Sequence, residues 1–285
     1  MNRDSHVTEQ IAVRESLPET SDQVFLLDAA VIIVVSVAIC FASQYLVFMS
    51  IWVPALVLLR CVIFGRLSEE KRPHSIRIEL LFLFVCTILG GFNDWNSVVH
   101  HRIYDYRAPV FFQKWSSIPI WMLLYWGMIL RFLVSLFRWH RLTPPKKAKN
   151  DLWIGRMHFQ HPWLRVLVLL MMVLATRQCI YRFYTDPWLS WLPFAMGLLV
   201  YMILFRPARY EWGLWGLFLL GGPGIEILYI QVGGLHYYHL GWIGGVPLWI
   251  GLWWLLVVPI WNDLSGRILA FMYSRSRSHI LRVGC

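Results

Sequence analysis

Charged residues are scarce in this chain, and their scarcity decides the class of protein. Of its 285 residues only 15% are Asp, Glu, Lys or Arg, whereas about 25% is usual in a soluble domain. The charges gather in short segments, and apolar runs of about 20 residues between them are long enough to cross a bilayer as helices. Helices are the expected form, because lipid offers the backbone no hydrogen-bond partner. We therefore expect an all-α, polytopic membrane helix bundle in contact with a lipid bilayer.

Two further features are missing. Segment 1–24 has two Arg, five acids and no apolar core, so it predicts a disordered acidic tail rather than a cleavable signal peptide. Cysteines are few, and four of the five (Cys40, Cys61, Cys86 and Cys179) fall inside apolar runs. We expect these cysteines to behave as small hydrophobic side chains rather than as disulfide partners.

The apolar runs predict about eight spans. They cover residues 25–44, 48–64, 76–98, 118–137, 164–184, 188–205, 210–232 and 246–261. The first two depend on a break at Ser43 and Gln44, and one long tilted helix in their place would give seven spans. Pro54 favours two helices, because by analogy with Pro193 it would lie early in a span of its own.

Basic residues orient the predicted spans. Segments 65–77, 138–165, 206–210 and 267–285 hold 17 of the 26 Lys and Arg residues and lie on one side of the spans. Because cytoplasmic loops are enriched in Lys and Arg, we expect both termini in the cytoplasm of a bacterial cell with the chain in its inner membrane. The same loops account for the net charge of +10, so no nucleic-acid partner is expected.

An internal repeat is the most informative pattern. Segment 90–106 matches segment 222–238 at a constant offset, and Ser-Ser-Ile-Pro-Ile-Trp at 116–121 matches Gly-Gly-Val-Pro-Leu-Trp at 244–249. The repeat predicts two parallel four-helix halves related by a pseudo-twofold axis along the membrane normal. The alternative is chance recurrence of Pro and Trp in a Trp-rich membrane protein.

The repeat also predicts a domain organisation. The segments are an acidic tail (1–24), a first four-helix membrane repeat (25–142), a basic cytoplasmic linker (143–162), a second four-helix repeat (163–267) and a basic cytoplasmic tail (268–285). The last segment interleaves Arg with apolar residues, which is typical of an amphipathic segment on an anionic leaflet.

Asp94 and Glu226 are the strongest candidates for catalytic chemistry. The repeat pairs them, and each follows a glycine-rich stretch in the outer half of a predicted span. A carboxylate in lipid is costly and marks a functional site by default. If both lie in one pocket, desolvation and mutual repulsion would make one of them a proton donor. The alternatives are neutralisation by Arg131 or Arg177, or solvation at the interface.

Polar and aromatic residues near the outer ends of the spans form the candidate substrate-binding set. The set is Asn93, Asn96, His100, His101, Tyr106, Arg177, Gln231, His236, Tyr238 and Trp253, with Tyr104, Asp105, Tyr237 and His239 beside it. We expect some of them to close a pocket by hydrogen bonding; the alternative is ordinary interfacial side chains. Their spacing matches no standard zinc or di-iron signature, so we expect no metal and no cofactor.

Two intramembrane cations and one aromatic residue leave alternatives open. Arg131, two turns from the cytoplasmic end of its span, could snorkel there or form an ion pair. Arg177, nearer the outer end, could reach the outer headgroups or pair with one of the two acids. The ring of Trp253 either stabilises a cation or carbocation or simply packs against its neighbours.

The second half resembles a family of membrane enzymes. The resemblance rests on Glu226, Tyr238 and Gly245-Val246-Pro247-Leu248 followed by Trp253, and it covers only part of that half. These features are similar to the carotenoid-biosynthesis hydratases of the bisanhydrobacterioruberin-hydratase type, although Leu235-His236-Tyr237-Tyr238 replaces that family's Gly-x-Tyr-x-Tyr. The resemblance implies proton-initiated addition of water to an isoprenoid double bond, with Glu226 as the candidate acid.

Three functional hypotheses follow. The first is an enzyme that acts on a lipid or isoprenoid by acid–base chemistry at Asp94 and Glu226. The second is a proton- or cation-coupled transporter that uses the same acids between two repeats; against it, the cytoplasmic half of the bundle has few polar residues to line a pathway. The third is a non-catalytic membrane assembly protein. The substrate and the oligomeric state do not follow from the sequence.

Overall fold

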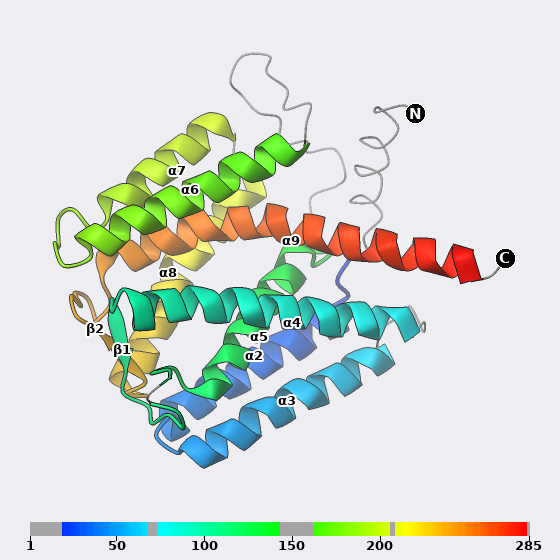
Figure 1. Ribbon diagram of the computed structural model, residues 1–285, viewed down its shortest axis with the longest axis horizontal. Helices are drawn as coiled ribbons and strands as arrows, with labels where there is room; N and C mark the ends of the chain where they lie inside the picture. Colours follow the sequence, from blue (N-terminus) through cyan, green and yellow to red (C-terminus); the bar gives the residue numbers. More distant parts are fainter. Residues whose placement is uncertain (1–18, 68–72, 114, 143–161, 206–208, 284–285) are drawn as a thin grey trace.

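The computed structural model describes residues 19–67, 73–113, 115–142, 162–205 and 209–283. Nearly all of the predicted linker 143–162, and residues 1–18 of the predicted acidic tail, lie outside these ranges. Within them the chain is mostly helical (Figure 1). The helices are α2 (Asp22–Ala42), α3 (Leu46–Leu67), α4 (Pro73–Trp95), α5 (Ile120–Phe137), α6 (Pro162–Phe183), α7 (Leu192–Leu204), α8 (Arg209–Gln231) and α9 (Leu248–Val283).

Seven of the described helices are long and apolar enough to cross a membrane. The exception is α7, whose 13 residues extend only about 20 Å at about 1.5 Å per residue. It nevertheless returns the chain to the level at which α6 begins. Arg165 lies near the start of α6 and Phe205 directly follows α7, and the guanidinium of Arg165 lies 5.0 Å from the ring centre of Phe205. The protein is therefore a multi-pass, all-α integral membrane protein.

The first long apolar run, residues 25–64, forms two helices, α2 and α3, as the proposed break at Ser43 and Gln44 predicts. The break is held by the loop after α8. Ser43 Oγ donates to the carbonyl of Gly233 at 2.5 Å, and Gln44 Nε2 donates to that of Gly234 at 3.1 Å. Pro54 lies inside α3 rather than at its start, so the analogy with Pro193 holds for the existence of the helix but not for its first residue.

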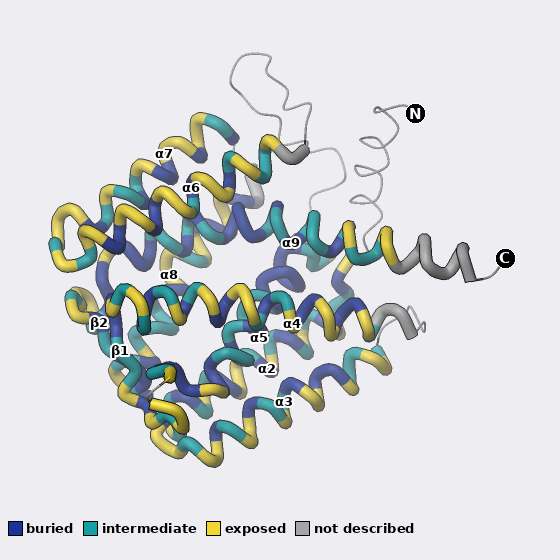
Figure 2. The backbone as a smooth tube through the Cα atoms, viewed as in Figure 1, coloured by how far each residue is buried: buried dark blue, intermediate teal, exposed yellow. Residues whose placement is uncertain are grey.

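The surface of the bundle is apolar. Large side chains such as Phe41, Leu58 and Leu220 are 76%, 65% and 77% exposed, and exposed residues recur along α3, α6 and α7 (Figure 2). Several charged side chains, among them Asp28 and Arg60, are instead fully buried. This distribution suits a molecule surrounded by lipid, which dissolves apolar side chains and penalises exposed charge.

A short two-stranded ribbon closes one end of the bundle. Strand β1 (Tyr104–Tyr106) follows α4 and a π-helical turn, η1 (Asn96–His100), and strand β2 (His236–Tyr238) follows α8. The two strands pair antiparallel and lie at the left of Figure 1. We call this the ribbon end, and the end at which α2 begins the opposite end.

Two glycines set how closely neighbouring helices approach. A Cβ on Gly90 of α4 would lie 2.7 Å from the Cβ of Trp126 on α5, and one on Gly222 of α8 would overlap the indole of Trp254 on α9. In each case the absence of a side chain lets a tryptophan of the next helix lie against the backbone. One glycine of each stretch before the two acids, Gly90 and Gly222, therefore lies in a helix–helix contact.

Helix α9 is longer than its sequence predicts. A span ending at 261 and a separate basic tail from 268 were expected, but one helix of 36 residues runs from Leu248 to Val283, drawn from orange to red in Figure 1. Asp263 explains the continuity in part. It accepts a hydrogen bond from Arg267 one turn later (2.9 Å) and forms an ion pair with Arg165 of α6 (3.5 Å).

Candidate functional site

Two carboxylates lie at the ribbon end, each capped by hydroxyl groups from the strand that follows its helix. The hydroxyls of Tyr104 and Tyr106 donate to the two carboxylate oxygens of Asp94, the latter at 2.8 Å. The hydroxyl of Tyr238 donates to Glu226 Oε2 at 2.6 Å. After α4 with its π-helical turn, and after α8, the chain turns back, so the strand that follows folds over the acid.

The ribbon joins the two acids into one cluster. Its register pairs Tyr104 with Tyr238, Asp105 with Tyr237, and Tyr106 with His236. Side chains alternate between the faces of a strand, so the first and last of these pairs share the buried face. The ring centres of Tyr104 and Tyr238 lie 5.1 Å apart. We call this set the acid–tyrosine cluster; it comprises Asp94, Tyr104, Tyr106, Glu226, His236 and Tyr238.

The tyrosines act as permanent donors. Burial, and then the charge of the neighbouring Asp94, raises the pKa of Tyr104 and of Tyr106 well above the ordinary value. Burial and the charge of Glu226 do the same to the pKa of Tyr238. All three phenols therefore stay protonated at any physiological pH and hold the acids by hydrogen bonds.

The two acids differ in one position. The offset of the repeat that relates Asp94 to Glu226 also relates Tyr104 to His236, so the first acid has two tyrosine donors and the second has one tyrosine and one histidine. His236 is 6% exposed, and neither of its ring nitrogens has a hydrogen-bond partner in the described part of the chain. Its Nε2 lies 3.7 Å from Glu226 Oε2. Asp94 is completely buried, whereas the Glu226 side chain is 12% exposed.

A second group of the predicted residues gathers around Arg177 on α6. Asn96 Nδ2 donates to the hydroxyl of Tyr181 at 2.6 Å, and the ring of His101 stacks on Tyr181 with centres 3.6 Å apart. Arg177 donates to the same hydroxyl at 3.2 Å and lies over the ring of Trp253 at 4.8 Å. Asn93 contributes its backbone carbonyl to Arg177, at 3.5 Å, and His100 contacts His101 edge-on.

Other predicted residues stay outside both groups. Gln231 is exposed and donates to the carbonyl of Gly244 at 2.9 Å, so it fixes a loop. Asp105, Tyr237 and His239 occupy the other face of the ribbon, where Asp105 Oδ2 accepts from the Tyr237 hydroxyl at 3.1 Å and lies 3.2 Å from His239 Nε2.

Neither intramembrane arginine neutralises the two acids in the described ranges. Of the alternatives left open for Arg131, the structure shows an ion pair rather than snorkelling, because its side chain is 9% exposed and its Nε donates to Glu79 Oε1 at 2.7 Å. Arg177 forms no ion pair with a carboxylate of the described residues. Physically, Arg131 has buried carboxylates within reach of its own level of the bundle, so it gains nothing by extending to the interface.

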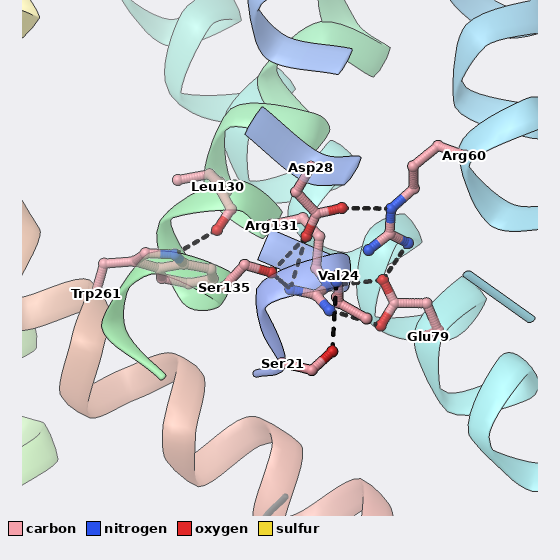
Figure 3. A network of polar contacts seen from close by, with 9 residues as sticks. All are labelled: Ser21, Val24, Asp28, Arg60, Glu79, Leu130, Arg131, Ser135 and Trp261. Atoms are coloured by element: carbon pink, nitrogen blue, oxygen red, sulfur yellow. Dashed lines mark hydrogen bonds and ion pairs between the residues drawn. The ribbon is translucent and has the colours of Figure 1, made fainter. Parts of the chain in front are cut away.

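Those carboxylates belong to a second buried network, toward the opposite end (Figure 3). Asp28 of α2 and Glu79 of α4 face Arg60 of α3 and Arg131 of α5, with Ser135 hydrogen-bonded to both Asp28 and Arg131. Arg60 Nε donates to Asp28 Oδ1 at 2.7 Å, and its Nη1 donates to Glu79. Two acids thus balance two arginines, and this end of the bundle is more polar than the apolar runs of the sequence suggest.

Sequence reasoning missed Asp28, Arg60 and Glu79 as site residues. The sequence does carry a signal for Asp28 and Arg60, because each interrupts an apolar run. An ionisable residue within a membrane span is costly unless an oppositely charged or hydrogen-bonding side chain lies beside it. The pairing of each acid with its arginines could not be predicted from the sequence, because the four side chains come from four helices that only tertiary packing brings together.

No group of three or more His, Cys, Asp or Glu side chains in the described ranges is placed to hold a metal ion. The cysteines described (Cys40, Cys61, Cys86 and Cys179) are free thiols. No family model matches the chain, and neither a curated protein nor a solved structure matches it. The fold and the cluster together define a multi-pass integral membrane protein with two tyrosine-capped carboxylates at one end, of which Asp94 is buried and Glu226 is partly buried.

Proposed function

We propose that this protein is a membrane-embedded enzyme that transfers a proton to or from an apolar lipid or isoprenoid substrate, with Glu226 and His236 as its acid–base pair. The observation that carries the proposal is the state of His236. It is an imidazole buried beside a carboxylate, at 3.7 Å, with no hydrogen bond from the described residues to hold it. A buried polar group without a partner is costly, and such groups recur where chemistry is done.

The difference between the acids assigns their roles. Asp94 is fully buried and receives two hydroxyl donors, so it acts as a fixed acceptor that positions the ribbon. Glu226 receives one such donor and keeps some exposure, so it is the acid that a substrate can reach. The rings of Tyr238 and Trp249, with centres 5.9 Å apart, offer aromatic faces that stabilise a passing carbocation.

One reaction fits these groups with its atoms in balance. Glu226 donates a proton to one carbon of a C=C bond, and the neighbouring carbon becomes cationic. A water molecule adds its oxygen to that carbon and loses a proton to His236, which returns it to Glu226. The net change is the addition of one water molecule across the double bond, and both residues regain their starting state. The resemblance to carotenoid hydratases supports this choice of reaction.

The test is deuterium transfer from solvent. The purified full-length protein would be incubated in D2O with squalene, an isoprenoid hydrocarbon, and with geranylgeraniol, an isoprenoid alcohol, and the products weighed by mass spectrometry. We expect carbon-bound deuterium with the wild type and none with Glu226→Gln or His236→Phe. Asp105→Asn, which removes an acid from the outer face of the ribbon, should behave as wild type. Equal deuterium incorporation by wild type and Glu226→Gln would refute the role of Glu226.

Infrared spectroscopy tests the pair without a substrate. An acid that donates protons must titrate, and its protonated carbonyl stretch shifts in D2O. We expect a titrating carboxylic band that Glu226→Gln removes and His236→Phe shifts. If no band is lost in Glu226→Gln, the carboxylate does not exchange protons and the acid–base assignment fails.

A proton-coupled transporter is the second candidate, and one observation favours it. The hydroxyls of Ser36, Tyr125 and Tyr229 bond to one another inside the bundle, with Ser36 Oγ 2.8 and 2.7 Å from the two phenols. They add buried polar groups to those of the acid–tyrosine cluster and of the ion-pair network. Proton flux into liposomes that contain the protein, lost in Tyr125→Phe, would select this function over catalysis.

We further infer that the chain arose by duplication. The register of the ribbon pairs Asp105 with Tyr237, two positions that the offset of the repeat also relates, so the pairing is symmetric about its centre. The Gly90–Trp126 and Gly222–Trp254 contacts and the capped acids recur in the same way. Both repeats in one orientation, the inner membrane of a bacterium and cytoplasmic termini are parts of the same proposal.

A further inference from the structure

Arg177 is the buried arginine that the described structure leaves without a countercharge. Arg60 and Arg131 are also buried, and each contacts two carboxylates. Arg177 is 7% exposed, yet no described carboxylate forms an ion pair with it. A guanidinium taken from water into a low-dielectric interior costs several kcal/mol unless an opposite charge accompanies it.

Every described group that holds Arg177 is neutral. Its Nη2 donates to Ser97 Oγ at 2.5 Å, its Nε donates to the Tyr181 hydroxyl at 3.2 Å, and its guanidinium lies over the ring of Trp253. These contacts orient the guanidinium and leave its charge intact. No hydrogen bond of Nη1 is present among the described residues.

The surroundings are electropositive. His101 stacks on Tyr181, and His100 lies edge-on to His101 with ring centres 4.5 Å apart. Burial, and then the charges of His100 and Arg177, lower the pKa of His101. These rings sit at the π-helical turn η1, a distortion that is frequent at functional sites. An anion placed here would meet one arginine and two imidazoles.

The position is next to the acid–tyrosine cluster. Ser97, which holds Arg177, is one turn from Asp94 on the same stretch of chain. Trp253 on α9 is one turn from Trp249, whose ring contacts Tyr238. A ligand with its anionic end at Arg177 would therefore have its hydrocarbon beginning beside the capped acids.

We propose that Arg177, with His101 and His100, binds a phosphate or pyrophosphate group, and that this group is the headgroup of the lipid or isoprenoid substrate. The planar guanidinium matches phosphate oxygens and offers two parallel donors. The second part of the proposal rests on the proposed function, whereas the anion site itself does not.

The experiment is thermal unfolding of the purified full-length protein in detergent with four probes. They are geranylgeranyl phosphate, geranylgeraniol, inorganic pyrophosphate and inorganic phosphate. We expect the phosphorylated isoprenoid to raise the unfolding temperature well beyond any rise that the alcohol gives, because the alcohol lacks the anion that Arg177 would bind. Equal rises with the alcohol and the phosphorylated isoprenoid would overturn the proposal. A rise of the same size with inorganic pyrophosphate or phosphate alone would keep the anion site and assign it to a soluble anion. No rise with any phosphorus compound would overturn the proposal.

Variants then locate the site. Arg177→Gln should weaken binding of the phosphorylated probe about 10- to 100-fold, the loss expected for hydrogen bonds to a charged group. Arg182→Gln removes the same charge from an exposed position further along the chain and should bind as wild type. If Arg177→Gln does not fold, Arg177→Lys keeps the charge without the planar fork and should bind more weakly. Equal binding by wild type and Arg177→Lys would refute recognition by the guanidinium.

Failure of this proposal is distinguishable from failure of the proposed function. Glu226→Gln should retain binding of the phosphorylated probe, because Glu226 is not among the described groups that contact Arg177. Binding that persists without any deuterium transfer would leave the anion site and remove the enzyme. Deuterium transfer to squalene without phosphate binding would keep the proposed enzyme and remove the anion site.

Discussion

At the scale of single residues, the pairing of charges separates the two ends of the bundle. Toward the opposite end, Asp28, Glu79, Arg60 and Arg131 neutralise one another (Figure 3). At the ribbon end, Asp94 is held by hydroxyl groups and Arg177 by neutral groups. Balanced networks are structural, since loss of either partner leaves a buried charge. Arg177, whose charge no described carboxylate balances, is the group to which we assign an anionic ligand.

The balanced network makes the first prediction. Glu79→Gln should destabilise the protein by about 3–5 kcal/mol, because it leaves two buried guanidinium groups with a single carboxylate. Thermal unfolding in detergent measures this. Arg141→Gln is the control, since that side chain is 62% exposed in its pair with Asp22, and it should leave the unfolding temperature nearly unchanged. A Glu79→Gln variant as stable as wild type would mean that the network contributes nothing.

His236 makes the second prediction. His236→Tyr gives Glu226 the pair of hydroxyl donors that Asp94 already has, and should raise stability by about 1 kcal/mol while abolishing deuterium transfer. His236→Phe supplies an aromatic ring without the hydroxyl, so it should lose deuterium transfer without any increase in stability. If both variants unfold at the same temperature, the added hydroxyl does not reach Glu226.

At the scale of the elements, helix contacts depend on where glycine stands. The backbone of α4 lies against Trp126 at Gly90, and that of α8 lies against Trp254 at Gly222. The sequence shows these glycines, but the tryptophans they meet are on the next helix, beyond a loop and a strand. At both positions the absence of a side chain lets the backbone approach the next helix closely. Only the structure shows that the partners are Trp126 and Trp254.

Gly222→Ala makes the third prediction. Its Cβ would overlap the indole of Trp254, so we expect a loss of about 1–3 kcal/mol from overpacking. Gly216→Ala lies on the same helix with no atom within 4 Å of the new Cβ, and should be neutral or slightly stabilising. Thermal unfolding of the two variants separates packing from helix propensity. Equal stability would show that Trp254 can move away at no cost.

At the scale of the whole molecule, the ribbon connects helices α2 to α5 with helices α6 to α9. Its two strands can also be used to determine which side of the membrane this end of the bundle occupies. Asp105 and Tyr237 are directly opposed in the ladder, within the range that a disulfide can bridge. In a background without the five native cysteines, Asp105→Cys with Tyr237→Cys should form a disulfide in growing bacteria if the ribbon faces the oxidising side. Non-reducing mass spectrometry detects the bond, and the two single variants are the controls.

A disulfide that appears only after an oxidant is added would confirm that the two strands pair. It would also show that the ribbon faces the reducing cytoplasm, which is the reverse of the proposed orientation. Reporter fusions give an independent check. A fluorescent protein that matures only in the cytoplasm should fluoresce at either terminus, because the basic segments lie on that side. Fluorescence at one terminus alone would mean an odd number of crossings, and α7, with 13 residues, would be the helix to re-examine.

Hydrophobicity and charge act locally along the chain, so the class of protein, the positions of the helices and the two acids could be predicted without a structure. The same local patterns placed the break at Ser43 and Gln44, and they singled out Asp94 and Glu226 as candidates, whose catalytic role stays a prediction. The sequence left alternatives open where the answer depends on a distant partner, as with Arg131. The caps on the acids, the environment of His236 and that of Arg177 emerged only from the packed bundle. A side chain's burial and bonding are set by the elements packed around it, and those neighbours come together only when the chain folds back on itself.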